Sequence, residues 1–201
     1  FRNVRREIFD ISNGNQQTEE STQLTGETFY LVKSDFEKEY DLADKFEEEG
    51  EYYDALSTLT SIIAKEPNVK AYSRRAAVYD EIEEYDNAIE DYTMCIKLSP
   101  EDLDAYISRA DIYVYLEEYD KALADFAKCI EIDPENPDTY FYRTTLYEDL
   151  EEYDLALADY NKAIEIDPED VTNYEYRADL YALLEDNPNA LLDYSRCIEL
   201  Y

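Results

Sequence analysis

Histidine is absent from this 201-residue sequence, and glycine occurs only three times. Without histidine, Ser-His and Cys-His catalysis, histidine general bases and most zinc sites are excluded. Three glycines are too few to build the Gly-rich loop that cradles phosphates. We therefore expect no catalytic residues, no cofactor and no metal site, and we do not expect an enzyme.

Positive charge is also scarce in this sequence. Lysine and arginine together number 18 against 51 aspartates and glutamates, a formal net charge of −33. Because affinity for nucleic acids depends on cations that neutralise phosphates, we expect neither a nucleic-acid partner nor an anionic membrane partner. The same imbalance favours a partner with basic residues. The alternative is that the charge serves only to keep the protein in solution.

Long apolar runs and paired cysteines are missing as well. No stretch approaches the roughly 20 apolar residues of a membrane-spanning helix, and residues 1–10 lack the apolar run of a signal peptide. Cys95, Cys129 and Cys197 are far apart and odd in number, which does not indicate a disulfide framework. We expect buried small residues at these positions, a reducing compartment and a cytoplasmic protein.

The sequence does contain an internal repeat with a period of 34 residues. Residues 69–102, 103–136 and 137–170 align over their whole length. Residues 171–201 continue the pattern, and residues 36–68 form a weaker copy that is one residue shorter. In each copy, aromatic and small residues recur at helical spacing on two successive segments, which predicts two amphipathic helices per repeat. The shared sequence EEYD marks the turn between them, and a proline ends the second helix.

This pattern resembles the tetratricopeptide repeat, and the resemblance covers residues 36–201. It implies an all-α, right-handed superhelical solenoid of antiparallel helix pairs, whose concave face is lined by the first helix of each pair. It also implies binding of peptides or proteins, not catalysis. In the second copy the matching residues are Tyr72, Ala76, Tyr79, Tyr85, Ala88, Tyr92, Cys95 and Pro100.

Two charged residues recur in every full repeat, one arginine in the first helix and one aspartate in the second. Recurrence favours a structural role, and a buried arginine needs a carboxylate partner. We predict that these charges pair within or between adjacent repeats as an internal ladder. The residues are Arg75, Arg109, Arg143 and Arg177, with Asp91, Asp125, Asp159 and Asp193.

Other residues of the first helices vary from repeat to repeat while the packing positions do not. In a stacked array, such variable positions are where a specific ligand is recognised. Aromatic and acidic side chains together suit lysine or arginine, whose stems pack on rings and whose charged ends meet carboxylates. The alternative is a solvated helix face with incidental tyrosines. The candidate binding residues are Tyr40, Asp44, Glu47, Arg74, Asp80, Ile107, Asp111, Tyr115, Phe141, Tyr142, Asp149, Tyr176 and Asp179.

Lys70 and Arg74 lie one helical turn apart, like two residues of the carboxylate clamp found in some chaperone-binding tetratricopeptide domains. That clamp also needs asparagine and lysine on preceding first helices, where this sequence has Tyr40, Asp41 and Asp44. We therefore expect no working clamp, and at most a local carboxylate contact.

The N-terminal region lies outside the repeats and differs from them in charge. Its first residues include Arg2, Arg5, Arg6 and Phe9, a basic and apolar block that could occupy an acidic groove in cis or in a second copy of the chain. A polar linker follows, and Ser34 with Glu37 forms a capping box for the first helix. The expected divisions are residues 1–11 (basic segment), 12–28 (linker), 29–35 (lead-in) and 36–201 (repeats).

Two functions remain open from the sequence. One is a protein-interaction module that binds a basic or mixed basic and aromatic peptide in the concave groove. The other is a structural assembly or homodimerisation module of a larger protein, of the scaffold or co-chaperone type, in which the groove is incidental.

Overall fold

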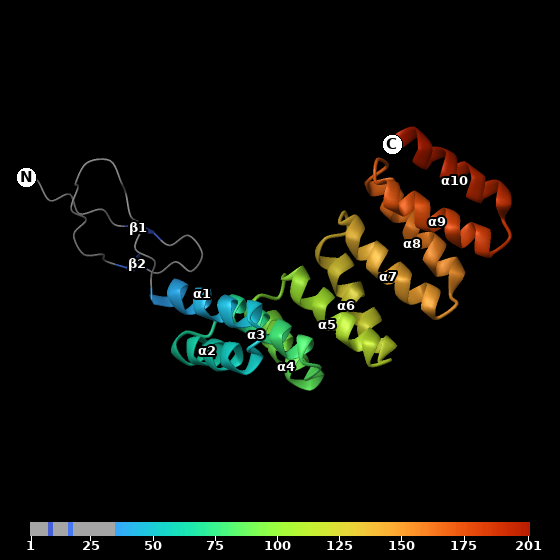
Figure 1. Ribbon diagram of the computed structural model, residues 1–201. Helices are drawn as coiled ribbons and strands as arrows, with labels where there is room; N and C mark the ends of the chain where they lie inside the picture. Colours follow the sequence, from blue (N-terminus) through green and yellow to red (C-terminus); the bar gives the residue numbers. More distant parts are fainter. Residues whose placement is uncertain (1–7, 10–15, 18–34) are drawn as a thin grey trace, which may run out of the picture. The chain divides into compact units, whose positions relative to one another are not determined.

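A computed structural model describes residues 8–9, 16–17 and 35–201 (Figure 1). The chain divides into two units, Phe1–Asp35 and Phe36–Tyr201. In the first unit, β1 (Ile8–Phe9) pairs antiparallel with β2 (Gln16–Gln17), a ladder that the sequence did not predict. Strand β2 falls within the expected linker, and the expectations for Arg2, Arg5, Arg6, the side chain of Phe9, the rest of the linker and the Ser34 cap lie outside the described residues.

The second unit is built from ten helices that follow one another as five antiparallel pairs (Figure 1). Each helix from α2 onward packs against the next one in the chain, so the pairs stack in tandem. This confirms the predicted all-α solenoid. The helices are α1 (Asp35–Glu48), α2 (Tyr52–Lys65), α3 (Val69–Glu81), α4 (Tyr85–Leu98), α5 (Leu103–Tyr115), α6 (Tyr119–Ile132), α7 (Pro137–Asp149), α8 (Tyr153–Ile166), α9 (Val171–Leu183) and α10 (Asn187–Leu200). In the part of the chain that the structure describes, none of them is long and apolar enough to cross a membrane.

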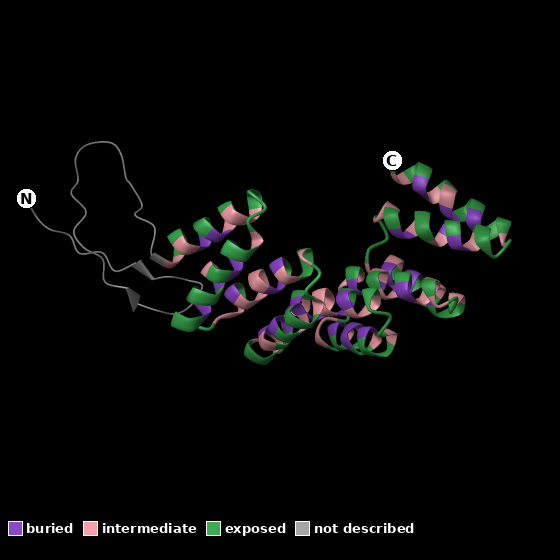
Figure 2. Cartoon of the chain, turned by 60° about the horizontal axis from the view of Figure 1, so that its bottom comes forward, coloured by how far each residue is buried: buried purple, intermediate pink, exposed green. Residues whose placement is uncertain are grey.

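The core consists of small and aromatic residues that recur at the same place in each repeat. Ala76 and Ala88 are completely buried, and they allow the paired helices α3 and α4 to approach closely. Figure 2 shows that buried positions form a stripe along each helix. The three cysteines belong to this core as free thiols. Burial raises the pKa of the Cys95 and Cys129 thiols to about 12, which favours the predicted structural role over a redox role.

The predicted charge ladder is present in the structure. The Nε and Nη2 atoms of Arg75 donate hydrogen bonds of 2.7 and 2.8 Å to the two carboxylate oxygens of Asp91, which is only 4% exposed. The rings of Tyr72 and Tyr79 lie 5.7 and 5.8 Å from the guanidinium carbon. The same bidentate pair joins Arg109 to Asp125, Arg143 to Asp159 and Arg177 to Asp193.

The ladder also connects neighbouring repeats. The Nη1 atom of Arg75 donates to Thr60 Oγ1 on α2, and Arg109 makes the equivalent bond to Thr93 on α4. Arg177 donates in the same way to Asn161 on α8. One side chain therefore links three helices, its own, the second helix of its repeat and the second helix of the repeat before.

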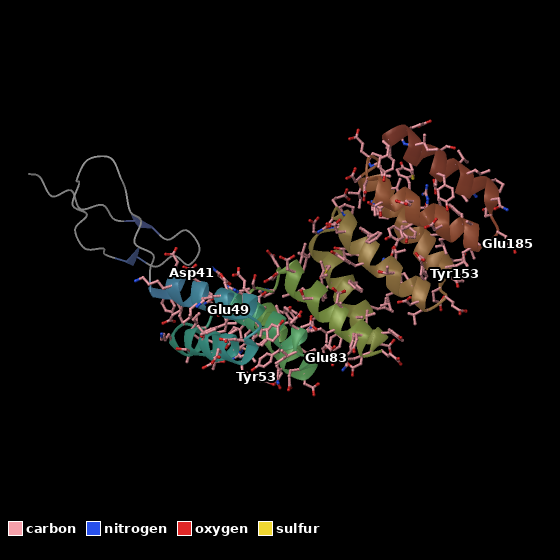
Figure 3. The ribbon with its side chains drawn as sticks, in the orientation of Figure 1. Asp41, Glu49, Tyr53, Glu83, Tyr153 and Glu185 are labelled. Carbon is pink, nitrogen blue, oxygen red and sulfur yellow. The ribbon has the colours of Figure 1, made fainter. Side chains whose placement is uncertain are left out.

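The turn between the helices of a pair uses a left-handed residue. Glu83 has φ of 62°, and its N–H bonds to Asp80 O while the N–H of Glu84 bonds to Tyr79 O. These bonds form a Schellman motif, in which glycine is the usual left-handed residue. The first repeat has Gly50 at this place, with φ of 74°. The later repeats place a glutamate there, namely Glu83, Glu117, Glu151 and Glu185, of which Glu83 and Glu185 are labelled in Figure 3.

We expect Glu117→Gly to stabilise the protein by about 0.5–1 kcal/mol, because a Cβ atom is unfavourable at positive φ. Chemical denaturation monitored by circular dichroism measures the change. Glu117→Gln removes the same charge and keeps the Cβ atom, so it serves as the control. A Glu117→Gly variant no more stable than the Glu117→Gln variant would contradict the backbone explanation.

Candidate functional site

The first helices of the repeats carry an exposed aromatic surface, as their spacing predicts. Tyr115 on α5, Tyr142 on α7 and Tyr176 on α9 expose 65%, 40% and 45% of their area. Their backbones are held by the buried alanines and ion pairs on the opposite side of the same helices. We call these variable, non-packing positions of α3, α5, α7 and α9 the first-helix surface.

Tyr40 does not belong to the exposed aromatics, so the expectation that it faces away from the core is wrong. It is only 9% exposed and packs in the core with Ala43 and Leu56. Its hydroxyl donates to Asn68 Oδ1 at 3.1 Å, which satisfies the polar end of the buried ring. Ile107 is half-buried.

Aromatic side chains from neighbouring helices meet in two places. Between α7, α8 and α9, the ring of Phe141 lies 5.3 Å from the ring of Tyr176 in an edge-on arrangement and 6.4 Å from the ring of Tyr160. Between α4 and α5, the centre of the Tyr115 ring lies 4.7 Å from the centre of the Tyr85 ring. Tyr85 and Tyr160 occupy packing positions of the repeat, so their spacing does not predict that they also border the exposed rings.

Two carboxylates of the first-helix surface accept hydrogen bonds from tyrosines at packing positions of the second helices. The hydroxyl of Tyr160 donates to Glu148 at 2.6 Å, and that of Tyr194 donates to Asp179 at 2.5 Å. Both bonds hold a carboxylate beside the exposed rings of α7 and α9. Asp149 is exposed at the end of α7, and none of the described contacts connects it to these groups.

Asp111 is the most perturbed carboxyl of this surface. Partial burial raises its pKa to about 6, and the negative charge of Asp80 on α3 adds to the shift. Burial likewise raises the pKa of Asp80, and the neighbouring charge of Glu81 adds to that shift. Carboxylates are therefore crowded on this surface without enough positive charge around them. Among the described residues, no group of three or more acidic or cysteine side chains is arranged to hold a metal ion.

Lys70 and Arg74 are already occupied by groups of the first repeat. Arg74 donates to Glu47 Oε1 at 3.1 Å and pairs with Asp44. The Lys70 ammonium lies 4.2 Å from the centre of the Tyr40 ring. The two cations thus hold local contacts and do not form a carboxylate clamp.

Comparison with known proteins agrees with this architecture. The family model described as tetratricopeptide repeat matches residues 69–102, 103–136 and 137–170. Because these matches cover half of the chain, the chain belongs to the tetratricopeptide repeat family. A search of curated proteins finds no match to the sequence.

Several solved structures share the fold. A crystal structure of MamA is 21% identical with a TM-score of 0.67, and the match covers 79% of this chain and 93% of that one. A tetratricopeptide repeat protein from Parabacteroides merdae is 26% identical with a TM-score of 0.65, covering 82% of this chain and 64% of that one. YrrB, described as a protein with an unusual peptide-binding site, is 20% identical with a TM-score of 0.60, covering 81% and 84%.

We expect Asp111→Asn to stabilise the folded state at pH 7, because it removes a carboxylate that is unfavourable to ionise there. Solvent screening of the partly exposed carboxylate limits this gain to roughly 1 kcal/mol. The folded-state pKa of about 6 lies above the ordinary value of 3.8. The folded protein therefore binds more protons than the unfolded chain between pH 4 and 6, and the free energy of unfolding falls as pH rises through this window.

The advantage of the Asp111→Asn variant should accordingly shrink towards zero as the pH falls to 4. Urea denaturation at pH 4, 5, 6 and 7 measures it. Glu90→Gln, which removes one exposed charge from α4, controls for the general effect of net charge. A stability difference independent of pH would show that the Asp111 carboxyl is not perturbed.

Proposed function

We propose that this protein is an interaction module that binds a basic, or mixed basic and aromatic, segment of a partner protein on the first-helix surface. The observation that carries the proposal is the crowding of carboxylates beside exposed rings. Burial and the charge of Asp80 make Asp111 costly to ionise by raising its pKa, and Tyr115 is largely exposed on the same helix as Asp111.

The physical chemistry of such a surface favours cations. A lysine or arginine of a partner relieves repulsion between the carboxylates, and its stem or guanidinium packs on a tyrosine ring. Complementary charge also accelerates encounter with the partner. A nucleic acid or an anionic membrane would instead be repelled by a chain of net charge −33.

The family and the structural neighbours support a binding role. YrrB, one of the solved structures with this fold, is described as having a peptide-binding site. We place the role in the cytoplasm, where the free Cys95, Cys129 and Cys197 would stay reduced. The basic block with Arg2, Arg5 and Arg6 is one candidate ligand, in cis or from a second copy.

Binding is tested with a fluorescein-labelled peptide of alternating arginine and phenylalanine, measured by fluorescence anisotropy with the full chain. We expect Asp111→Lys to weaken binding at least tenfold, because it places a like charge beside the ligand. Glu90→Lys makes the same change of charge on α4, a second helix, and should weaken binding less than twofold. Equal losses in the two variants would reduce the interaction to net charge and reject a defined surface.

Assembly is the second candidate function, and the apolar face of α10 favours it. Leu191 and Ile198 on this face are 66% and 78% exposed. At the equivalent positions of α4, Ile89 and Ile96 are half-buried and pack against a cluster that includes Ile112 of α5. The positions that join one repeat to the next are therefore uncovered on α10.

If the α10 face joins copies of this chain, light scattering of the chain at about 50 µM should give a multiple of the monomer mass of 23.7 kDa. The double variant Leu191→Glu with Ile198→Glu should restore the monomer mass, because burying two carboxylates in the interface is costly. Tyr53→Glu, on an exposed residue of α2 (labelled in Figure 3), is the control. A monomeric parent chain would reject assembly through this face.

A further inference from the structure

The acids of the first-helix surface follow a period of two repeats. Counted within the 34-residue repeat, the twelfth residue is acidic in Asp80 and Glu148, and the ninth is acidic in Asp111 and Asp179. The acid at Asp80 therefore recurs 68 residues later as Glu148, and the acid at Asp111 recurs 68 residues later as Asp179. At the interface between copies 103–136 and 137–170, the matching positions hold the uncharged residues Val114 and Thr145.

The stacking of the helices brings each acidic twelfth residue towards the acidic ninth residue of the next repeat. Tyr92 on α4 interacts electrostatically with both Asp80 and Asp111. Sixty-eight residues later, Tyr160 on α8 does the same with Glu148 and Asp179, and it donates its hydroxyl hydrogen bond to Glu148. The surface thus carries two equivalent acid pairs, Asp80–Asp111 and Glu148–Asp179.

The helices α5 and α7, which carry the two inner acids Asp111 and Glu148, also carry exposed tyrosines. Tyr115 follows Val114 at the end of α5 and is the most exposed of the first-helix tyrosines. Tyr142 is exposed on α7. A ligand that spans both acid pairs would therefore pass over exposed rings, which accept apolar side chains.

The first repeat shows a cation held by acids at the same two repeat positions, with both acids there on the one helix α1. Aligned on the left-handed residues Gly50 and Glu83, Asp44 and Glu47 take the ninth and twelfth positions. Both carboxylates pair with Arg74, the sixth residue of the next repeat, and Arg74 lies 5.7 Å from the centre of the Tyr40 ring. An arginine paired with two acids and lying over a ring therefore occurs on this scaffold.

At the acid pair of α7 and α9 the ring is present and the arginine is not. Phe141 takes the position of Tyr40, and Tyr176 takes the position of Arg74. At the other acid pair, Ser108 takes the position of Arg74. In the described part of the chain, no lysine or arginine forms a salt bridge with Asp80, Asp111, Glu148 or Asp179.

We propose that the two acid pairs are two subsites for two basic side chains of a single extended partner segment, whose intervening apolar residues lie over Tyr115 and Tyr142. This inference rests on the proposed function and adds a bipartite requirement to it. Neighbouring packed helices lie about 8–10 Å apart, so two repeats separate the subsites by roughly 20 Å. That distance corresponds to about six residues of extended chain.

The test uses synthetic peptides with two arginines separated by two, six or ten residues of alternating serine and tyrosine, and matched peptides in which either arginine is glutamine. Calorimetry with the full chain measures each affinity. The two-arginine peptide with the six-residue spacer should bind at least tenfold tighter than either one-arginine peptide, because the second contact is intramolecular. The two-residue spacer should show no such gain.

Variants of single subsites sharpen the test. Asp111→Asn and Asp179→Asn should each remove most of the gain of the two-arginine peptide. Each should weaken a one-arginine peptide only about twofold, since the other subsite remains. Glu90→Gln should change neither. Thermal unfolding confirms that each variant is folded.

The outcomes separate this inference from the proposed function. If one-arginine and two-arginine peptides bind equally tightly at every spacing, or if one of the two variants has no effect, the bipartite surface is rejected while basic-peptide binding stands. If no arginine peptide binds at all, both are rejected.

Discussion

The stacking of the helix pairs depends on one ion pair that recurs in four of the repeats. Each arginine is bound through two nitrogens to an almost buried aspartate and lies between two tyrosine rings, as Arg109 does with Asp125. Removing one partner of such a pair leaves an uncompensated buried charge, which typically costs about 3–5 kcal/mol. The ion pair thereby sets the position of both helices of its repeat, and its third nitrogen reaches the preceding repeat in three of the four cases.

This constraint explains why the variable residues are concentrated on one surface. Alanine, cysteine, tyrosine and the ion pair occupy the packing positions, so a substitution there disturbs a repeat and its neighbour. The position of Asp111 is alanine, threonine or aspartate in other repeats. Side chains at such positions do not hold the helices of the repeat together. They can therefore differ along the array, and here they combine negative charge with exposed rings.

Much of the scaffold could be predicted from the sequence because it is repeated. The period, the helix pairs, the structural cysteines and the pairing of Arg75 with Asp91 all follow from residues that recur at fixed spacing. The left-handed Glu83 was not predicted, because a glutamate carries no signal for positive φ. The prediction for Tyr40 was wrong because the first repeat is the most divergent copy, and the hydroxyl of Tyr40 bonds to Asn68, the cap residue of α3 in the next repeat.

The surface was harder to predict, because its contacts form between repeats. Exposure of Tyr115, Tyr142 and Tyr176 follows from helical spacing within one helix. The meeting of Asp80 with Asp111 depends on how one repeat stacks on the next, and helical spacing does not contain that information. The hydroxyls of Tyr160 and Tyr194 reach surface carboxylates from packing positions, so a residue can serve the core and the surface together.

The central claim is that the exposed rings and crowded acids of the first helices form the binding surface. Ring signals of isotope-labelled tyrosine, followed by NMR as the two-arginine peptide is added to the full chain, test it most directly. The account predicts that Tyr115, Tyr142 and Tyr176 shift while the more exposed Tyr53 and Tyr201 do not. Shifts of equal size at all five rings, or shifts confined to Tyr53 and Tyr201, would contradict it.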